Sequence, residues 1–164
     1  MGMEEIMEKT IPLTQAYFDE QTTKLKEMET TGRTQVAEAI KLAKEFGDLS
    51  ENAEYTAAKN AQEKLEIDIA KLTEMLSKAY PIDTSLLKGD VVEVGTYVKV
   101  YDVEFEEELD YQVVSSCEAD TSKNRISNES PIGRALMGKK VGAKVSFDAP
   151  GGEMEFKILK VYVK

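Results

Sequence analysis

Two long amphipathic stretches on either side of a short polar break constrain the fold more than any other feature of this chain. The first stretch, from about Thr14 to Phe46, contains no proline, and the second runs from Asn52 to Ala79. Narrow apolar stripes at helical spacing predict that both stretches are helices. Apolar or small residues recur in steps of three, four or seven at Phe18, Leu25, Met28, Gly32, Val36, Ile40 and Ala43, and then at Ala58, Ala61, Leu65, Ile69, Leu72, Leu76 and Ala79.

Because only a few residues separate the two helices, we expect an antiparallel hairpin that buries one stripe against the other. Arms of about 30 residues at ~1.5 Å per residue give a rod of roughly 45 Å. The remaining faces of both helices are charged, so much of the rod is expected to be exposed. On periodicity alone, an ordinary structural or dimerising coiled coil fits the pattern as well as a functional rod.

The polar break, Glu45 to Tyr55, is acidic. Gly47 suits the left-handed residue that ends a helix. Asp48 lies three residues before Glu51, the spacing of a capping box that opens the second helix, and Ser50 is an alternative N-cap with acids in the first turn. The same spacing would place two carboxylates on one side of a helical turn, where both could approach one hard cation such as Mg2+. Capping and metal binding are therefore both open interpretations of these acids.

Composition narrows the chemistry that the chain can perform alone. Its 164 residues hold one large domain or two small ones. The absence of histidine removes Ser-His and Cys-His catalysis, and with Cys117 as the only cysteine there is no internal disulfide or cysteine-built zinc site. The formal net charge of −10 argues against broad DNA or membrane binding. No segment has the pattern of a membrane span or a signal peptide, so we expect a cytoplasmic protein.

The second half of the chain has the pattern of a small α+β unit. Ser130 at the N-cap and Pro131 at the first helical position predict a short helix, which Gly138 can end. Pro150-Gly151-Gly152 is expected to turn the chain between the last two strands. The acidic run 102–110 is expected to form a solvated hairpin. Short runs typical of strands are 91–94, 97–100, 111–114, 144–147 and 155–163.

Several segments resemble one known family. Gly47-Asp48-Leu49-Ser50-Glu51-Asn52-Ala53-Glu54-Tyr55 closely resembles the tip motif of the GreA/GreB family of bacterial transcription elongation (transcript cleavage) factors, and of its GreA members in particular. Ser130 to Lys139 and Pro150 to Phe156 match the family in the same order, and Ile11-Pro12-Leu13-Thr14 looks like its start. The resemblance covers nearly the whole chain, and the tip nonapeptide is its most specific part.

The resemblance implies an α+β protein built from two domains. An N-terminal antiparallel coiled-coil hairpin would occupy residues 1–80 with its acidic tip near 47–55, followed by a linker at 81–89 and an FKBP-like domain at 90–164. Thr34 stands where many relatives carry a proline, and a glycine of the family's first helix is also missing. These departures put the bending of the first helix in doubt. The leader Met1 to Thr10 is expected to be frayed.

The resemblance also implies a function. Such a factor enters the secondary channel of bacterial RNA polymerase when the enzyme has backtracked, and stimulates endonucleolytic cleavage near the 3′ end of the nascent RNA. Asp48 and Glu51 match the family's paired tip acids, which hold the second Mg2+ of the polymerase site. The protein would thus have no cofactor of its own, would share Mg2+ with the polymerase, would not be an enzyme alone, and would act as a monomer without contacting a membrane.

Further contacts follow from the same resemblance. Relatives carry basic residues at the places of Lys44 and Lys59, which with Lys41 and Lys64 would steady extruded RNA through its phosphates. The alternative is that these lysines balance nearby glutamates on the surface. Tyr55 would either stack on RNA or pack on the rod.

The C-terminal half offers one candidate partner contact and one rival function. Glu118-Ala119-Asp120 lies where the family's C-terminal domain docks on the polymerase, so Asp120 is a candidate contact. A prolyl isomerase or chaperone is suggested by the FKBP-like fold alone, which does not carry function, and the chain lacks tryptophan for an aromatic pocket. A channel-binding inhibitor is the other rival. The Asp-Leu-Ser-Glu-Asn order of the tip favours stimulation, since inhibitory homologues carry a denser, rearranged acid cluster.

Overall fold

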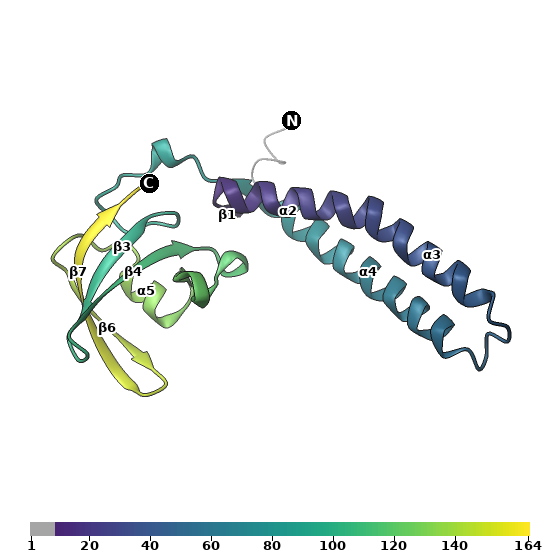
Figure 1. Ribbon diagram of the computed structural model, residues 1–164. Coiled ribbons are helices and arrows are strands. Elements are labelled where there is room, and N and C mark those ends of the chain that lie inside the picture. Colours follow the sequence, from purple (N-terminus) through teal and green to yellow (C-terminus); the bar gives the residue numbers. More distant parts are fainter. Residues whose placement is uncertain (1–8) are drawn as a thin grey trace. The chain divides into compact units, whose positions relative to one another are not determined.

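The computed structural model describes residues 9–164, which divide into two compact units (Figure 1). The first unit contains Phe18–Ala79, and the second combines Thr10–Tyr17 with Tyr80–Lys164. The predicted α+β class is confirmed, with a helical hairpin followed by a sheet domain. Most of the leader expected to be frayed, residues 1–8, lies outside the described residues. No helix within residues 9–164 is long and apolar enough to cross a membrane.

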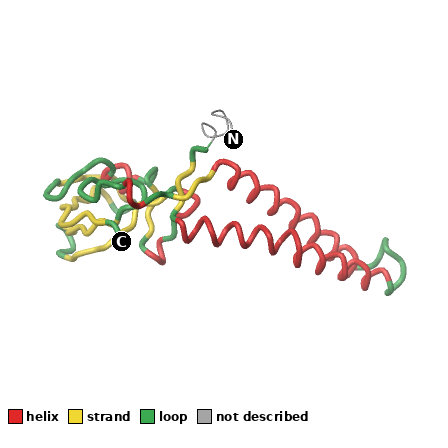
Figure 2. Tube along the Cα trace, turned by 90° about the horizontal axis from the view of Figure 1, so that it is seen from above, coloured by secondary structure: helices red, strands yellow, loops and turns green. Residues whose placement is uncertain are grey.

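The hairpin consists of two helical arms joined by a loop, as the apolar stripes predict (Figure 2). The first arm is α2 (Gln15–Glu27), a π-helical turn (Met28–Gly32) and α3 (Arg33–Lys44). The second arm is α4 (Ala53–Lys78). An ion pair joins the arms, with Nε of Arg33 2.9 Å from a carboxylate oxygen of Glu66. Both side chains are about half exposed, so this pair adds little to the stability of the hairpin.

Burial along the arms mostly follows the expected stripes, although Gln21 of α2 is buried outside them. Ala43, Ala58 and Ile69 are buried, and the other stripe residues are mostly half-buried. Ala61 was wrongly placed in the stripe, because it is exposed and Gln62 is half-buried instead. A seam between two helices is narrow, and the methylenes of glutamine cover more of it than an alanine methyl does.

The π-helical turn interrupts a segment that the sequence predicts as one regular helix. Its stripe advances in three successive four-residue steps, Met28, Gly32, Val36 and Ile40, whereas an α-helix has 3.6 residues per turn. A π-helical turn contains more residues than an α-helical turn, so the extra residues of these steps are accommodated there. The apolar stripe therefore stays on the face that contacts the other arm. Gly32 faces Leu65 there, since a Cβ at Gly32 would lie 3.3 Å from a Leu65 methyl. Thr34 follows directly, in the first turn of α3.

The second unit is built on a five-stranded sheet in the order β5-β4-β3-β7-β6. All neighbours are antiparallel except β4 and β5, which are parallel. A separate two-stranded sheet pairs β1 (Ile11–Leu13) with β2 (Ala79–Pro81). The strands of the larger sheet are β3 (Tyr97–Asp102), β4 (Glu107–Val114), β5 (Arg125–Ser127), β6 (Lys144–Ala149) and β7 (Gly152–Tyr162).

One face of this sheet carries the core. Burial alternates strictly along β3, where Val98 and Val100 are fully buried and their neighbours are not, as expected for a sheet with one packed face. Phe156 and Ile158 of β7 and Leu136 of α5 (Pro131–Leu136) join them in one cluster. Three short 3-10 turns complete the unit: Thr84–Leu86, Ser116–Glu118 and Thr121–Lys123.

The local predictions for this unit are mostly confirmed. Ser130 caps α5, its hydroxyl accepting from the Gly133 N–H at 3.1 Å, with Pro131 in the first turn. Gly133 admits no side chain, because a Cβ would lie 1.8 Å from the Ser127 carbonyl oxygen. The turn at 150–152 joins β6 to β7, and residues 103–106 form the exposed turn between β3 and β4.

The predicted strand at 91–94 is wrong. Val91 forms only an isolated bridge to Lys140, and the chain then turns. Glu93 N–H donates to the Thr96 hydroxyl at 3.1 Å, Thr96 N–H donates to the Glu93 carbonyl at 3.0 Å, and Gly95 has a φ of +103°. Strand β5 was not predicted, since three residues are too few to show a period.

Candidate functional site

The loop that joins the two arms carries the acidic tip. Helix α3 ends at Lys44, and Gly47 adopts a φ of +108° with open space where a Cβ would stand. The expected helix-ending role of Gly47 is thereby confirmed. Helix α4 does not begin until Ala53. Asp48 and Glu51 therefore lie in the loop itself, and the expectation that they share one helical turn is wrong.

Asn52 is the residue that organises this loop. Its side-chain oxygen accepts from the Tyr55 N–H at 3.0 Å and caps α4, while its side-chain nitrogen donates to the Ala43 carbonyl at 2.6 Å. Both predicted caps, Asp48 and Ser50, are therefore wrong. Both hydrogen bonds need one short side chain that has an acceptor oxygen for the N–H of one arm and a donor N–H for the carbonyl of the other, which is a primary amide. An aspartate has no proton to donate, and a serine side chain is too short.

Asp48 is held by a local turn rather than by the helix. One carboxylate oxygen accepts from the Ser50 N–H at 3.0 Å and from the Ser50 hydroxyl at 2.9 Å. These two hydrogen bonds, the backbone one first, lower the pKa of Asp48 below its usual value. The side chain is fully exposed. Asp48 is thus an ionised, oriented carboxylate that faces solvent.

The tip is acidic but does not form a metal cage by itself. The side chains of Glu45, Asp48, Glu51 and Glu54 are all exposed. Within residues 9–164, no three acidic, cysteine or histidine side chains converge closely enough to hold a metal ion. Carboxylate oxygens are the ligands that Mg2+ prefers, and Mg2+ takes only one or two of them from a protein while keeping waters or substrate oxygens. The donor set therefore fits part of a magnesium site.

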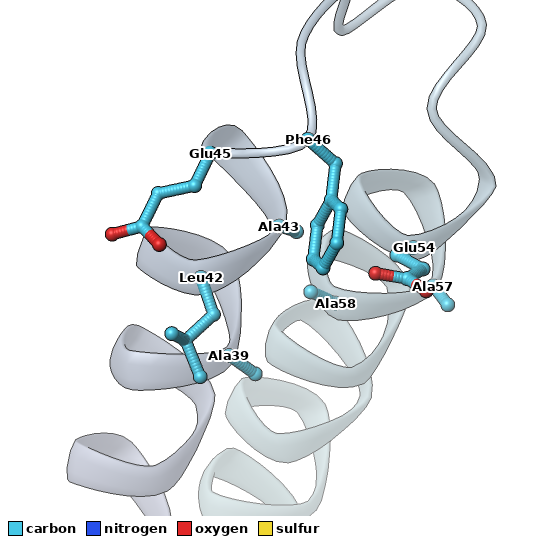
Figure 3. A pocket seen from close by; sticks show the side chains of 8 residues that line it. All are labelled: Ala39, Leu42, Ala43, Glu45, Phe46, Glu54, Ala57 and Ala58. Carbon is cyan, nitrogen blue, oxygen red and sulfur yellow. The ribbon is translucent and has the colours of Figure 1, made fainter.

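Next to the loop, the ends of the two arms form an apolar groove of about 490 Å3. The small side chains of Ala43 and Ala58 are buried at the base of the groove, and the Phe46 ring lies beside them between the arms (Figure 3). Phe46 is 72% exposed and Leu42 is 58% exposed. Glu45 and Glu54 also line the groove. The groove therefore presents two large apolar side chains and two acids to solvent beside the loop.

The candidate RNA-contacting residues fall on both arms near the loop. Lys44 is the last residue of α3 and is exposed, while the Lys59 ammonium donates to the Gln62 side chain at 3.1 Å. Lys64 instead pairs with Asp68 at 2.8 Å, as the charge-balancing alternative predicts. Within the described chain, Lys41, Lys44 and Lys59 form no ion pair. Tyr55 is half-buried, so it packs partly on the hairpin and keeps an exposed part.

Asp120 and its neighbour Glu118 have different environments in the second unit. Asp120 accepts from the Ser122 N–H at 3.0 Å and the Ser122 hydroxyl at 2.6 Å, and the hydroxyl is the main cause of its lowered pKa. Glu118 is only 3% exposed. Its carboxylate accepts from the N–H and the hydroxyl of Thr14 at 2.9 and 2.6 Å, and lies 3.8 Å from Arg125. Glu118 is therefore a structural anchor that no local sequence pattern indicates.

Comparisons with known proteins place the chain in a family. Two family models match: "Transcription elongation factor, N-terminal" over residues 11–80 and "Transcription elongation factor, GreA/GreB, C-term" over residues 87–163. The transcription elongation factor GreA of Thermoanaerobacter pseudethanolicus is 48% identical over 155 residues, 94% of this chain and 99% of that protein. The GreA of Clostridium acetobutylicum is 50% identical over 137 residues, 84% of this chain and 87% of that protein.

Among solved structures, GreA factor homolog 1 (Gfh1) of Thermus thermophilus is 30% identical over 93% of this chain and 98% of that chain, with a TM-score of 0.41. The two family models together match residues 11–80 and 87–163. From the two family models and the curated relatives together, the chain belongs to the GreA/GreB family of transcription elongation factors.

Proposed function

We propose that this protein is a transcript cleavage factor that acts on backtracked bacterial RNA polymerase. The hairpin would enter the secondary channel, and its tip would reach the 3′ end of the nascent RNA. The observation that carries the proposal is the exposed pair Asp48 and Glu51, on a loop held between two long helices, in a chain related throughout to GreA factors. The apolar groove beside the loop supports insertion into a partner, because its exposed side chains would be covered there.

In this proposal the tip residues have separate tasks. Asp48 supplies an ionised carboxylate, which Ser50 holds in one orientation through two hydrogen bonds. Glu51 supplies a second carboxylate three residues further along the loop. When bound between these acids and the polymerase, Mg2+ would supply a Lewis acid that activates water for hydrolysis. Asn52 keeps the loop tied to both arms, so that the acids arrive in a fixed position.

The tip supplies only some of the groups that RNA cleavage would need. Two carboxylates complete only part of a magnesium shell, so the remaining ligands and the RNA must come from the polymerase. The protein would therefore stimulate the polymerase's own cleavage and would not cut RNA alone. The −10 net charge disfavours RNA binding in solution. Lys44, Lys59 and the exposed part of Tyr55 would contact the RNA only after the polymerase has positioned it.

The second unit would dock the factor outside the channel as a monomer in the cytoplasm. Asp120 is the candidate contact, on a 3-10 turn whose geometry its own side chain sets. Docking would hold the tip at a high effective concentration in the channel. This accounts for how two exposed acids with weak intrinsic metal affinity could act on one site.

The test is RNA cleavage by a halted, backtracked bacterial polymerase with labelled transcript and Mg2+, with and without this protein. We expect internal cleavage only in the complete mixture. Asp48→Asn keeps the oxygen that accepts from Ser50, and Glu51→Gln keeps the size of the side chain, yet each should lose most of the stimulation. Glu38→Gln, an exposed acid of α3 outside the loop and the groove, is the matched control and should stimulate normally. Cleavage by the isolated protein, or full stimulation by both tip variants, would refute the proposal.

A further inference from the structure

The second unit carries a polar pocket of about 480 Å3 on the sheet face opposite its core. The pocket follows one row of residues across four neighbouring strands. Tyr162 of β7 pairs with Tyr97 of β3, Tyr97 with Gln112 of β4, and Gln112 with Arg125 of β5. Cross-strand partners project from the same face, so all four side chains line one continuous surface, and all four line the pocket.

Gln112 is the most informative member of this row. It is only 7% exposed, and within residues 9–164 its side-chain amide forms no hydrogen bond. No side-chain nitrogen or oxygen in the described chain is both fully enclosed and unpaired, so the amide must face the pocket space. The amide is therefore open to the pocket space and is free to pair with a ligand there.

Charged side chains of both signs line the pocket around Gln112. Lys123, Arg125 and Lys164 line the pocket and are its cations. Asp110 is the only acid in the lining, and the Tyr162 hydroxyl donates to it at 3.4 Å. Arg125 also lies 3.8 Å from the buried Glu118 carboxylate, and Asp120 is close to Lys123 and Arg125. Lys123 and Lys164 are therefore the lining cations that form no ion pair within the described residues, and they would attract an anionic group to this pocket.

Two stacked tyrosine rings form one side of the pocket. Tyr97 and Tyr162 stack with ring centres 5.4 Å apart and planes 18° apart. Lys164 lies 4.5 Å from the Tyr97 ring centre, and Lys160 lies 4.7 Å from that of Tyr162. These cation–π contacts hold the Lys164 ammonium close to the pocket while leaving its charge unpaired by an acid within the described residues. An incoming anion would thus meet a cation that is already positioned.

We propose that this pocket binds a nucleoside 5′-phosphate. The phosphate would lie against Lys123, Arg125 and Lys164, and the Gln112 amide would pair with the edge of the base, since it offers both a donor and an acceptor. Asp110 would accept from a ribose hydroxyl. Inorganic phosphate could accept from the Gln112 amide, but it has neither a base edge to pair with both the donor and the acceptor of that amide nor a ribose hydroxyl for Asp110. A nucleic acid strand would bring further phosphates to a chain whose formal net charge is already −10, which disfavours its binding.

The experiment is calorimetric titration of the full chain with AMP, GMP, CMP and UMP, with inorganic phosphate, and with a short single-stranded RNA. We expect saturable binding of at least one nucleotide, weaker binding of phosphate, and no tighter binding of the RNA. Lys123→Gln and Gln112→Met should each weaken that binding by about tenfold. Lys144→Gln is the matched control, because Lys144 is an exposed lysine on β6, at the opposite edge of the sheet from β5.

A second measurement separates a ligand role from a structural role for Gln112. Because its amide has no partner in the protein, Gln112→Met should leave the thermal unfolding midpoint unchanged or raise it. The proposal is overturned if none of the four nucleotides binds saturably, if phosphate binds as tightly as the nucleotides, or if the RNA binds tighter. Wild-type affinity in both Lys123→Gln and Gln112→Met would also overturn it.

Discussion

Replacing Asn52 by alanine should destabilise the hairpin by about 2 kcal/mol. The substitution removes the N-cap of α4, worth about 1 kcal/mol, and the hydrogen bond to the Ala43 carbonyl, worth a further ~1 kcal/mol. Asn52→Asp should cost only about half as much, because its carboxylate still accepts from the Tyr55 N–H but cannot donate to Ala43. The expected order of stability is therefore wild type, then Asn52→Asp, then Asn52→Ala.

Urea unfolding followed by far-UV circular dichroism measures this, since most of the helix lies in the hairpin. A loss of about 2 kcal/mol should lower the unfolding midpoint by about 1 M for a typical slope of ~2 kcal/mol per M. Asn60→Ala is the matched control. Asn60 is exposed in the interior of α4, so its replacement removes no cap and should raise stability by a few tenths of a kcal/mol through helix propensity.

The result that would refute this reasoning is an Asn52→Ala midpoint equal to that of wild type, measured beside the control. Equal stability of the Asp and Ala variants would refute the assigned split between the two hydrogen bonds. In the cleavage assay, Asn52→Ala should lose stimulation although both acids remain, because the loop that positions them is released from one arm.

Three further predictions concern single side chains. Ser50→Ala should raise the pKa of Asp48 part of the way to its usual value, which an NMR titration of the Asp48 carboxyl group would measure. In the wild type, the turn that depends on this carboxylate is fully formed above the usual aspartate pKa and is lost as the pH falls through the lowered pKa of Asp48. Gly133→Ala should destabilise the second unit by more than about 3 kcal/mol. Gly32→Ala should cost less stability, because only a Leu65 methyl group must move. Thermal unfolding of both variants measures the difference. Glu118→Ala should cost about 2–3 kcal/mol by leaving Thr14 without its acceptors, and wild-type stability in the same measurement would contradict the anchor.

The elements that the sequence could predict are those whose signal is local and repeated. The two arms show a helical period over some 30 residues each, and α5 begins with Ser130 and Pro131 in the order that helix caps require. The π-helical turn also had a signal, the three four-residue steps from Met28 to Ile40, which exceed the period of an α-helix. Steps of four residues also occur in a regular stripe, so they do not by themselves distinguish a π-helical turn from an α-helix.

The features that the sequence could not predict are set by distant partners. Glu118 has the composition of a surface acid, and it is buried only because Thr14, 104 positions earlier, supplies two donors. Strand β5 exists because three residues pair in parallel with β4. At the tip, Asp48, Ser50 and Asn52 have similar cap preferences, and the choice is made by the Ala43 carbonyl at the end of the other arm.

The position of the cap changes how the tip acids should be interpreted. From the sequence, helix capping and metal binding competed to explain Asp48 and Glu51, because one geometry would serve both. In the structure Asn52 performs the capping, and Glu51 lies in the loop before it. Neither acid is then needed to start α4, and Asp48 contributes only a turn that an asparagine can also form. A conservative exchange at Asp48 therefore removes the charge while leaving the helix start intact, so a loss of cleavage in that variant would report on the carboxylate and not on the fold of the tip.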